Sequence, residues 1–539
     1  MKKILAAFVL TAALISCTNV NEGVGGEFIP TDQKYDFYSA EFPLEDIQIK
    51  VVDSLSGYSS RHINFGAIRD ETFGLVRRGC AVTLVPCVDS VDLGVNPTLK
   101  RFSFKAGVDS VSVADEGQGN ILQNVYVYDI TEPLDPAKYY SRSEVKHGSK
   151  KITKGTPVIN GSDSLTFDFT TEFAKRYLTL TQDDMTDLET YSKKFPGIYL
   201  TTNDPIGLGG RFNMFKMNIL EDAKTYKYRS DNYAILYYTS TYDGERKDTT
   251  LMFYFSPLEF QDLDKHISNN TLPDQYVFNV DYHESNNFVG KAGEEIIVEG
   301  GSGVKPVISA NEIKRLVSAE VTGNGGDPAT ALVVKATIEM PFIFPDDYRK
   351  MFLYPDILSP TIKISTDTTV AFAGLTDASV SDENQGDINR SLCVYAPDVT
   401  HHVQQILRKD DIDDISAYDI WMLIMHKVAT TTTNADASEM AQYYQQLAYY
   451  SYYNQLYGGG YGYGGYGGYG GYGGYGYGGY GYNNYYNYMM MAQYASASAS
   501  STSYTAELDK DNFYRCKLAG PGYPGRYPKL KLTYAIPKK

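Results

Sequence analysis

The dominant pattern along this chain is an alternation of apolar and polar residues with period two. In the first half it runs through Ile47–Val51, Phe102–Lys105, Val108–Val113 and Val125–Tyr128. Alternation puts the apolar side chains on one face of an extended segment, so each stretch predicts a half-buried β-strand. Short strands separated by turn residues are typical of antiparallel β-sandwiches. The pattern therefore predicts an all-β fold.

The second half repeats this pattern down to the C-terminus. Strands are predicted at Ala234–Tyr238, Leu251–Phe255, Ala331–Ile338, Tyr418–Met425, Tyr514–Leu518 and Leu530–Tyr534. We predict two antiparallel β-sandwich, jelly-roll-like domains, the first over residues 35–285 and the second over residues 286–539.

Two short segments break the alternation with helical spacing. Thr170–Leu178 predicts a helix with Thr170 or Thr171 as its N-cap, because a threonine side chain can accept a hydrogen bond from the first helical turn. Asp398–Leu407 predicts a second short helix after a strand. Gly207–Arg211 is glycine-rich and is predicted to be a turn, and Trp421 is predicted to lie in the core.

An abrupt change of composition interrupts the second domain at residues 436–506. No charged residue occurs between Met440 and Ala506, and residues 457–482 are only tyrosine and glycine. Tyrosine offers a large contact area at low entropic cost, and methionine adapts to irregular surfaces, so this insert predicts an arm that binds another protein. A low-complexity loop, self-association and glycan stacking remain alternatives. The predicted contact residues are Tyr449, Tyr450, Tyr452, Tyr453, Tyr463, Tyr466, Tyr469, Tyr472, Tyr475, Met489, Met490 and Met491.

The N-terminus has the three parts of a secretory leader. Lys2 and Lys3 precede an apolar run, Ile4–Ile15, which is shorter than the roughly 20 residues of a membrane-spanning helix. Leu14-Ile15-Ser16-Cys17 then resembles the bacterial lipoprotein signal. We expect residues 1–16 to be removed, Cys17 to carry the lipid, and residues 17–34 to form a flexible tether. This predicts a protein anchored by lipid to the outer membrane, at the cell surface in preference to the periplasmic face.

The net negative charge of the chain limits which partners it is expected to bind. The formal net charge is −16, and removal of Lys2 and Lys3 with the leader makes it −18. An acidic surface argues against nucleic acid as a partner, and attachment to an anionic membrane then depends on the lipid.

The remaining cysteines and histidines give no decisive site. Cys80, Cys87, Cys393 and Cys516 could form disulfides or stay as buried thiols, and their spacing does not fit a zinc site. His401 and His402 lie close in sequence to Asp410–Asp414, where a solvated acidic turn is favoured over a metal site. We expect no cofactor, no resident metal and no catalytic motif.

Several scattered segments share one further pattern: Cys17 with Gly25–Pro30, Phe65–Gly74, Val108–Val111, Val127–Asp135, Val298–Gly303 and Tyr527–Tyr534. Together they resemble a lipoprotein family described as domain of unknown function 4270. One departure is Glu299, which stands where the family has glutamine. The resemblance implies an outer-membrane lipoprotein without a known catalytic motif, and it transfers no functional residues.

The sequence thus predicts a non-enzymatic accessory protein that binds an outer-membrane β-barrel protein or another lipoprotein. One option is a part in outer-membrane protein export or assembly. A glycan-binding surface module, an adhesin and a hydrolase are the alternatives.

Overall fold

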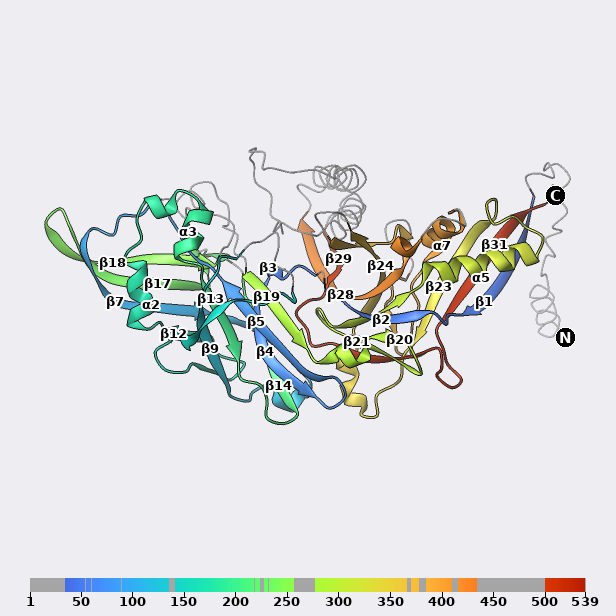
Figure 1. Ribbon diagram of the computed structural model, residues 1–539, viewed down its shortest axis with the longest axis horizontal. Helices are drawn as coiled ribbons and strands as arrows, with labels where there is room; N and C mark the ends of the chain where they lie inside the picture. Colours follow the sequence, from blue (N-terminus) through green and yellow to red (C-terminus); the bar gives the residue numbers. More distant parts are fainter. Residues whose placement is uncertain are drawn as a thin grey trace, which may run out of the picture.

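The computed structural model is predominantly β, with 51% strand and 15% helix, which confirms the all-β, sandwich-like fold. It describes residues 34–538 except residues 54, 60, 89, 135–140, 218, 223–226, 231, 256–276, 366–369, 378–383, 410–414 and 434–499. Figure 1 shows an elongated molecule, with one body at the end that carries β18 and the other at the end that carries β31.

Two antiparallel sheets form the first sandwich. The larger has the order β10 (His147–Lys151), β9 (Gln123–Ile130), β13 (Ile198–Thr202), β5 (Gly74–Val82), β4 (His62–Asp70), β14 (Gly209–Lys216) and β8 (Val108–Val113); β3 (Tyr58–Ser59), β11 (Val158–Ile159) and β19 (Val277–His283) pair alongside. The smaller has the order β12 (Leu165–Asp168), β7 (Val95–Ala106), β17 (Tyr233–Tyr242), β18 (Glu245–Phe255) and β6 (Leu84–Pro86). A separate hairpin joins β15 (Ile219–Asp222) to β16 (Lys227–Ser230).

The core of this sandwich is rich in aromatic rings. Phe102 of β7 contacts Phe169, Phe173, Tyr177 and Phe253, with ring centroids 4.7 to 6.3 Å apart. Two of these rings belong to helix α2 (Thr171–Tyr177), and helix α3 (Leu188–Lys194) adds further apolar contacts. Thr170 is the N-cap of α2, because its hydroxyl accepts a hydrogen bond from the Phe173 amide at 3.3 Å, as the sequence predicts.

The second body also has two main sheets. One has the order β1 (Tyr35–Pro43), β31 (Lys529–Pro537), β23 (Leu332–Pro341), β27 (Val394–Tyr395) and β26 (Ile388–Asn389). The other has the order β20 (Gly290–Lys291), β2 (Ile47–Val51), β22 (Val304–Ile308), β28 (Ile420–Thr433), β24 (Ile357–Ser365) and β25 (Val370–Gly374), with β29 (Ser500–Leu508) paired to β28. A further pair consists of β21 (Glu295–Glu299) and β30 (Arg515–Ala519).

Helices complete the core of the second body. Helix α5 (Ala310–Gly323) and helix α7 (Thr400–Leu407) pack with both sheets into one aliphatic cluster. The short 3-10 helices in the described part of the chain are η3 (Glu116–Gln118), η4 (Asp183–Met185), η5 (Ser285–Phe288), η6 (Tyr348–Leu353) and η7 (Ser416–Tyr418). Of the helices in the described residues, none combines the length and apolarity needed to cross a membrane.

Helix α5 was not among the elements predicted from sequence. Ser309 caps it by accepting a hydrogen bond from the Glu312 amide at 3.3 Å. The Glu312 carboxylate accepts the amides of Glu45 and Asp46, each at 2.9 Å, and so ties the start of α5 to the corner between β1 and β2. The serine and the glutamate three residues later are the signature of a capping box, so the signal for this helix was present in the sequence.

The first two strands lie in the second body. β1 pairs with β31 over nine consecutive residue pairs, and β2 pairs with β22. Tyr35–Val51 therefore hydrogen-bond with strands from beyond residue 285, although the predicted division places them in the first domain. The described part of the chain thus starts in the second body, crosses to build the first, and returns.

Candidate functional site

The main concentration of buried charge lies where the two bodies meet. Five side chains from five strands or adjoining segments gather there: Arg78 of β5, Asp281 of β19, Glu299 of β21, Lys305 of β22 and Arg515 of β30. We call these five residues the junction cluster. Because buried charges are costly unless they are paired, the junction cluster is the candidate functional site of the described residues.

An ion pair lies at the centre of the junction cluster. Arg78 Nε lies 2.7 Å from Asp281 Oδ1, and the two side chains are 1% and 5% exposed. Burial alone would raise the pKa of Asp281, but the Arg78 charge, with help from His283 and the Ser302 amide, outweighs burial and holds that pKa well below its usual range. The same guanidinium also donates to the Asp511 carbonyl and covers the ring of Phe212 at 4.4 Å.

A glycine-rich turn from the second body fits over this pair. The turn is Gly300–Gly303, between β21 and β22, and Ser302 donates its amide to Asp281 Oδ2 at 3.1 Å. Gly301 has φ +54°, and a Cβ there would overlap Asp281 Oδ2 and lie 2.7 Å from Arg78 Nη2. Only glycine therefore allows the backbone to approach the ion pair this closely.

Lys305 is buried beneath the same turn. Its Nζ donates to the carbonyl of Glu299 and to the carbonyl of Gly301 at 3.1 Å. Burial lowers the pKa of Lys305 to about 7, although the Glu299 carboxylate acts in the opposite direction. Glu299 Oε1 lies 3.6 Å from both His283 Nδ1 and Arg515 Nη2.

The segment between β29 and β30 adds a second set of polar contacts. His62 Nδ1 lies 2.6 Å from Asp511 Oδ2, and His62 Nε2 lies 3.1 Å from Asp109 Oδ2. Burial acts to lower the pKa of His62, but the two carboxylates outweigh burial and raise it. Burial acts to raise the pKa of Asp511, but the contacts with His62 and Arg78 outweigh burial and lower this pKa to about 2.

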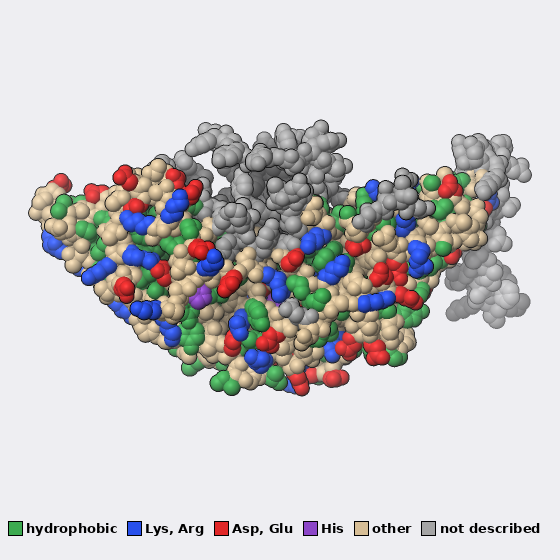
Figure 2. Space-filling model, in the orientation of Figure 1, with side chains coloured by type: hydrophobic (Ala, Val, Ile, Leu, Met, Phe, Trp, Pro, Cys, Tyr) green, Lys and Arg blue, Asp and Glu red, His purple; other side chains and the backbone are tan. Residues whose placement is uncertain are grey.

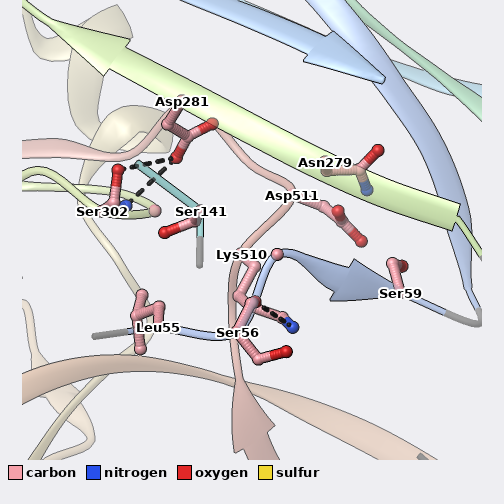
Figure 3. Close-up of a pocket in the computed structure, with 11 residues that line it drawn as sticks. Leu55, Ser56, Ser59, Ser141, Asn279, Asp281, Ser302, Lys510 and Asp511 are labelled. Atoms are coloured by element: carbon pink, nitrogen blue, oxygen red, sulfur yellow. Dashed lines mark hydrogen bonds between the residues drawn. The ribbon is translucent and has the colours of Figure 1, made fainter. Parts of the chain in front are cut away.

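A small cavity, lined mostly by polar residues, adjoins the cluster (Figure 3). Asp281, Ser302 and Asp511 line it, while Lys510 donates to the carbonyls of Ser56 and Tyr58 at 3.0 and 2.8 Å. The space admits about one water molecule. A space of this size suits a bridging water.

The residues predicted from sequence to act in binding lie elsewhere. Cys17, the tyrosines and methionines of the 436–506 insert from Tyr449 to Met491, and Asp410–Asp414 are all outside the described residues. Within the described part of the chain, no group of histidine, cysteine and carboxylate side chains could hold a metal ion.

The two adjacent histidines are used in different ways. His402 is buried, its Nε2 lies 2.8 Å from the Tyr418 carbonyl, and burial lowers its pKa to about 4. His401 is exposed on the same helix. The Asp377 carboxylate accepts the backbone amides of both residues and so stabilises the first turn of α7.

The four cysteines after Cys17 are free thiols. Cys80 lies in the core of the first sandwich and Cys516 in the core of the second body, and burial raises the pKa of both thiols. Of the two alternatives left open by the sequence, the structure supports free thiols. Trp421 is 7% exposed and packs against Phe372, which confirms its place in a core.

Sequence reasoning missed the junction cluster. The turn at Gly300–Gly303 was visible, but its partners Arg78 and Asp281 stand in ordinary strand sequence. Searches for related proteins add no information, since no family model, no curated protein and no solved structure matches the chain. The resemblance to the lipoprotein family described above stays a prediction.

Proposed function

We propose that this protein is a lipid-anchored accessory protein of the outer membrane that acts by contact with a membrane β-barrel protein or another lipoprotein. Cys17 carries the lipid, and residues 17–34 link it to the folded body. The insert at residues 436–506 is the segment that contacts the partner.

The observation that carries the proposal is the place where the chain enters the body. Tyr35 pairs with Pro537 at one end of the long axis, and the first sandwich lies at the opposite end (Figure 1). A flexible linker as long as residues 17–34 has a root-mean-square length of about 23 Å. An anchor at Cys17 would therefore hold the β1 end near the membrane and leave the first sandwich free to extend from it.

The junction cluster supports the same reading. Ser302 of the second body donates its amide to Asp281 of the first at 3.1 Å, and Arg78 of the first body donates to the Asp511 carbonyl of the second. These contacts favour one relative orientation of the bodies. A body of fixed length suits a protein that presents a surface to a partner. On the face drawn in Figure 2, acidic and basic side chains are interspersed, which is typical of a surface that faces water.

The proposal is tested by isolating the protein from its own membrane in mild detergent. We expect the wild-type chain to run in a complex larger than its own mass. Deletion of residues 440–506 should release the partner while the protein remains in the membrane fraction. Cys17→Ala should abolish membrane attachment. A wild-type chain that runs alone, unchanged by the deletion, would contradict the proposal.

A glycan-binding role is the second candidate, favoured by one group of rings on the first sandwich. His147 stacks between Tyr128 and Tyr199, at 4.7 and 5.0 Å, and Lys151 Nζ lies 4.2 Å from the centre of the Tyr126 ring. Aromatic rings beside polar groups are suited to sugar rings. A glycan array in which wild type binds and Tyr126→Ala does not would favour this role, and an array without a hit would count against it.

A further inference from the structure

Strand β1 forms one edge of its sheet and has an open side. The sheet order starts at β1, and within the described residues no strand pairs with its second edge. Its register with β31 runs from Tyr35 to Pro43 without a shift. An edge strand of this length and regularity offers a row of backbone groups to another strand.

The register identifies which backbone groups point outward. The Lys538 amide donates to the Lys34 carbonyl at 2.7 Å, and the Leu44 amide donates to the Pro528 carbonyl at 2.9 Å. The even-numbered residues of β1 therefore bond to β31, since bonding alternates along an antiparallel pair. The odd-numbered residues direct their amides and carbonyls outward; these are Tyr35, Phe37, Ser39, Glu41 and, with a carbonyl only, Pro43.

This edge carries only part of the protection that natural edge strands show: Asp36 and Glu41 are charged, but the strand has no bulge against β31. Bulges, internal prolines and inward charges are the usual devices. Here the only proline lies at the last residue, and Phe37 is 68% exposed. Leu332 and Val334 of β23 are 37% and 50% exposed, and the register places Leu332 and Phe37 on either side of Ala535.

We propose that β1 pairs antiparallel with β1 of a second copy of this chain, which joins the two five-stranded sheets into one. A two-fold axis at Ser39 pairs the outward groups of Ser39 with themselves and those of Phe37 with Glu41 of the second copy. This inference goes beyond the proposed function, because it concerns a contact between copies and not with another protein.

The side chains on the strand are compatible with this pairing. In the Ser39-centred register, Phe37 faces Glu41, Asp36 faces Phe42, and Tyr38 faces Ala40 of the second copy. No two like charges face each other, and aromatic side chains take part in most of the opposed pairs. The edge also follows directly after the predicted tether, so anchored copies would meet in the plane of one membrane at a high effective concentration.

The first test is cross-linking through Ser39→Cys in the full-length chain, with Cys393→Ser to remove the half-buried free thiol. Opposed residues of a hydrogen-bonded antiparallel pair lie about 5.5 Å apart at Cα, within the range that a disulfide spans. Thr533→Cys is the matched control, because Thr533 lies opposite Ser39 on β31 and on the same face. Two such residues would be about 15 Å apart and could not be bridged.

The second test exchanges charge at one position. Phe37→Glu puts a carboxylate opposite Glu41 of the second copy, at two symmetric places, and should weaken dimerisation about tenfold. Phe37→Lys removes the same ring but offers an opposite charge, so it should leave dimerisation close to wild type. Sedimentation of both variants in detergent measures the difference.

The outcomes of these tests show whether a second copy of this chain or another protein pairs with the open edge of β1. A cross-linked dimer with Ser39→Cys, none with Thr533→Cys, and a Glu–Lys difference at position 37 support the proposal. A monomer at every concentration, with equal cross-linking of the two cysteine variants, overturns it. Cross-linking of position 39 to a protein of another mass also overturns it, because the edge is then filled by a different partner.

Discussion

The core of the first sandwich and the junction between the bodies hold the molecule together by different means. In the core, Phe102 lies among rings whose centroids are 4.7, 5.0 and 5.4 Å away, and no charge is involved in these contacts. At the junction, Arg78 Nε lies 2.7 Å from Asp281 Oδ1 beneath a glycine turn. Apolar burial is non-directional, whereas an ion pair requires one geometry.

The difference assigns a separate role to each region. The core determines whether the first sandwich folds, and the junction determines how that sandwich is held against the second body. Breaking the core should lower stability at every pH. Breaking the junction should uncouple the two bodies and should change how stability depends on pH.

The largest effect is expected for Phe102→Ala. This change removes a fully buried ring from a cluster of five and should lower the free energy of unfolding by about 3–5 kcal/mol. Urea unfolding followed by circular dichroism measures it, and the transition of the first sandwich should move most. Tyr348→Ala is the control, because that ring is 72% exposed and its loss should cost less than about 0.5 kcal/mol.

Asp281→Ala comes next. It leaves the Arg78 guanidinium buried without its carboxylate and should cost about 3 kcal/mol. The double variant Arg78→Met with Asp281→Leu removes both charges and should recover most of that loss, since a well-packed apolar pair replaces a buried ion pair with little penalty. Equal destabilisation in the single and double variants would show that charge does not govern this contact.

Gly301→Ala should have a smaller effect, about 2 kcal/mol in total. The matched control is Gly155→Ala: Gly155 has φ +81°, and a Cβ added there would meet no atom within 4 Å, so its cost of about 1 kcal/mol reports backbone strain alone. The additional loss of stability in Gly301→Ala, compared with Gly155→Ala, measures the displacement of the turn from the Arg78–Asp281 pair. Differential scanning calorimetry should also show the two bodies unfolding in more clearly separated steps.

A pH dependence of stability is also expected from Lys305. Its pKa is lowered to about 7 in the folded chain, below the ordinary value of 10.5, so the unfolded chain binds more protons between these values. Stability from this group therefore rises with pH above about 7, by at most about 1.4 kcal/mol per pH unit. Urea midpoints at pH 7, 8 and 9 should show a positive difference in slope between wild type and Lys305→Met.

Stability should also fall at acid pH, and we call this part of the curve of stability against pH the acid limb. The pKa of Asp511 is lowered to about 2, and that of Asp281 is also lowered, so both carboxylates stabilise the fold above their unfolded pKa, which is about 4. That stability is lost as the pH falls from about 4 toward 2. Asp511→Asn should flatten this limb, and a wild-type curve without an acid limb would contradict the assignment.

Local patterns allowed much of the secondary structure to be predicted. The alternation at Val108–Val113 became β8, and Thr170 caps α2 as expected. Both depend on neighbouring residues in the sequence, so the local physics suffices. Helix α5 was missed even though Ser309 and Glu312 form a capping signature at its start.

Contacts between distant residues could not be predicted in this way. Gly207–Arg211 was expected to be a turn, but its last three residues, Gly209–Arg211, begin β14. Arg211 is fully buried, and its Nη1 donates to the carbonyls of Gly119 and Ile121, each at 2.8 Å. The prediction was wrong because a glycine pair is typical of a turn, and the strand that pairs with it, β4, lies far away in the sequence. Arg78 and Asp281 are 203 positions apart, and nothing local marks them as partners.

The pairing of β1 with β31 has a consequence for how the protein is made. The first strand finds its hydrogen-bond partner only after residues 529–537 have been synthesised. The sheet that contains β1 therefore cannot be completed until these residues have been made, whereas the described strands of the first sandwich are all available by residue 283. Folding is consequently ordered: the first sandwich, built from the middle of the described chain, is able to mature before the strand that completes the sheet of β1 has been synthesised.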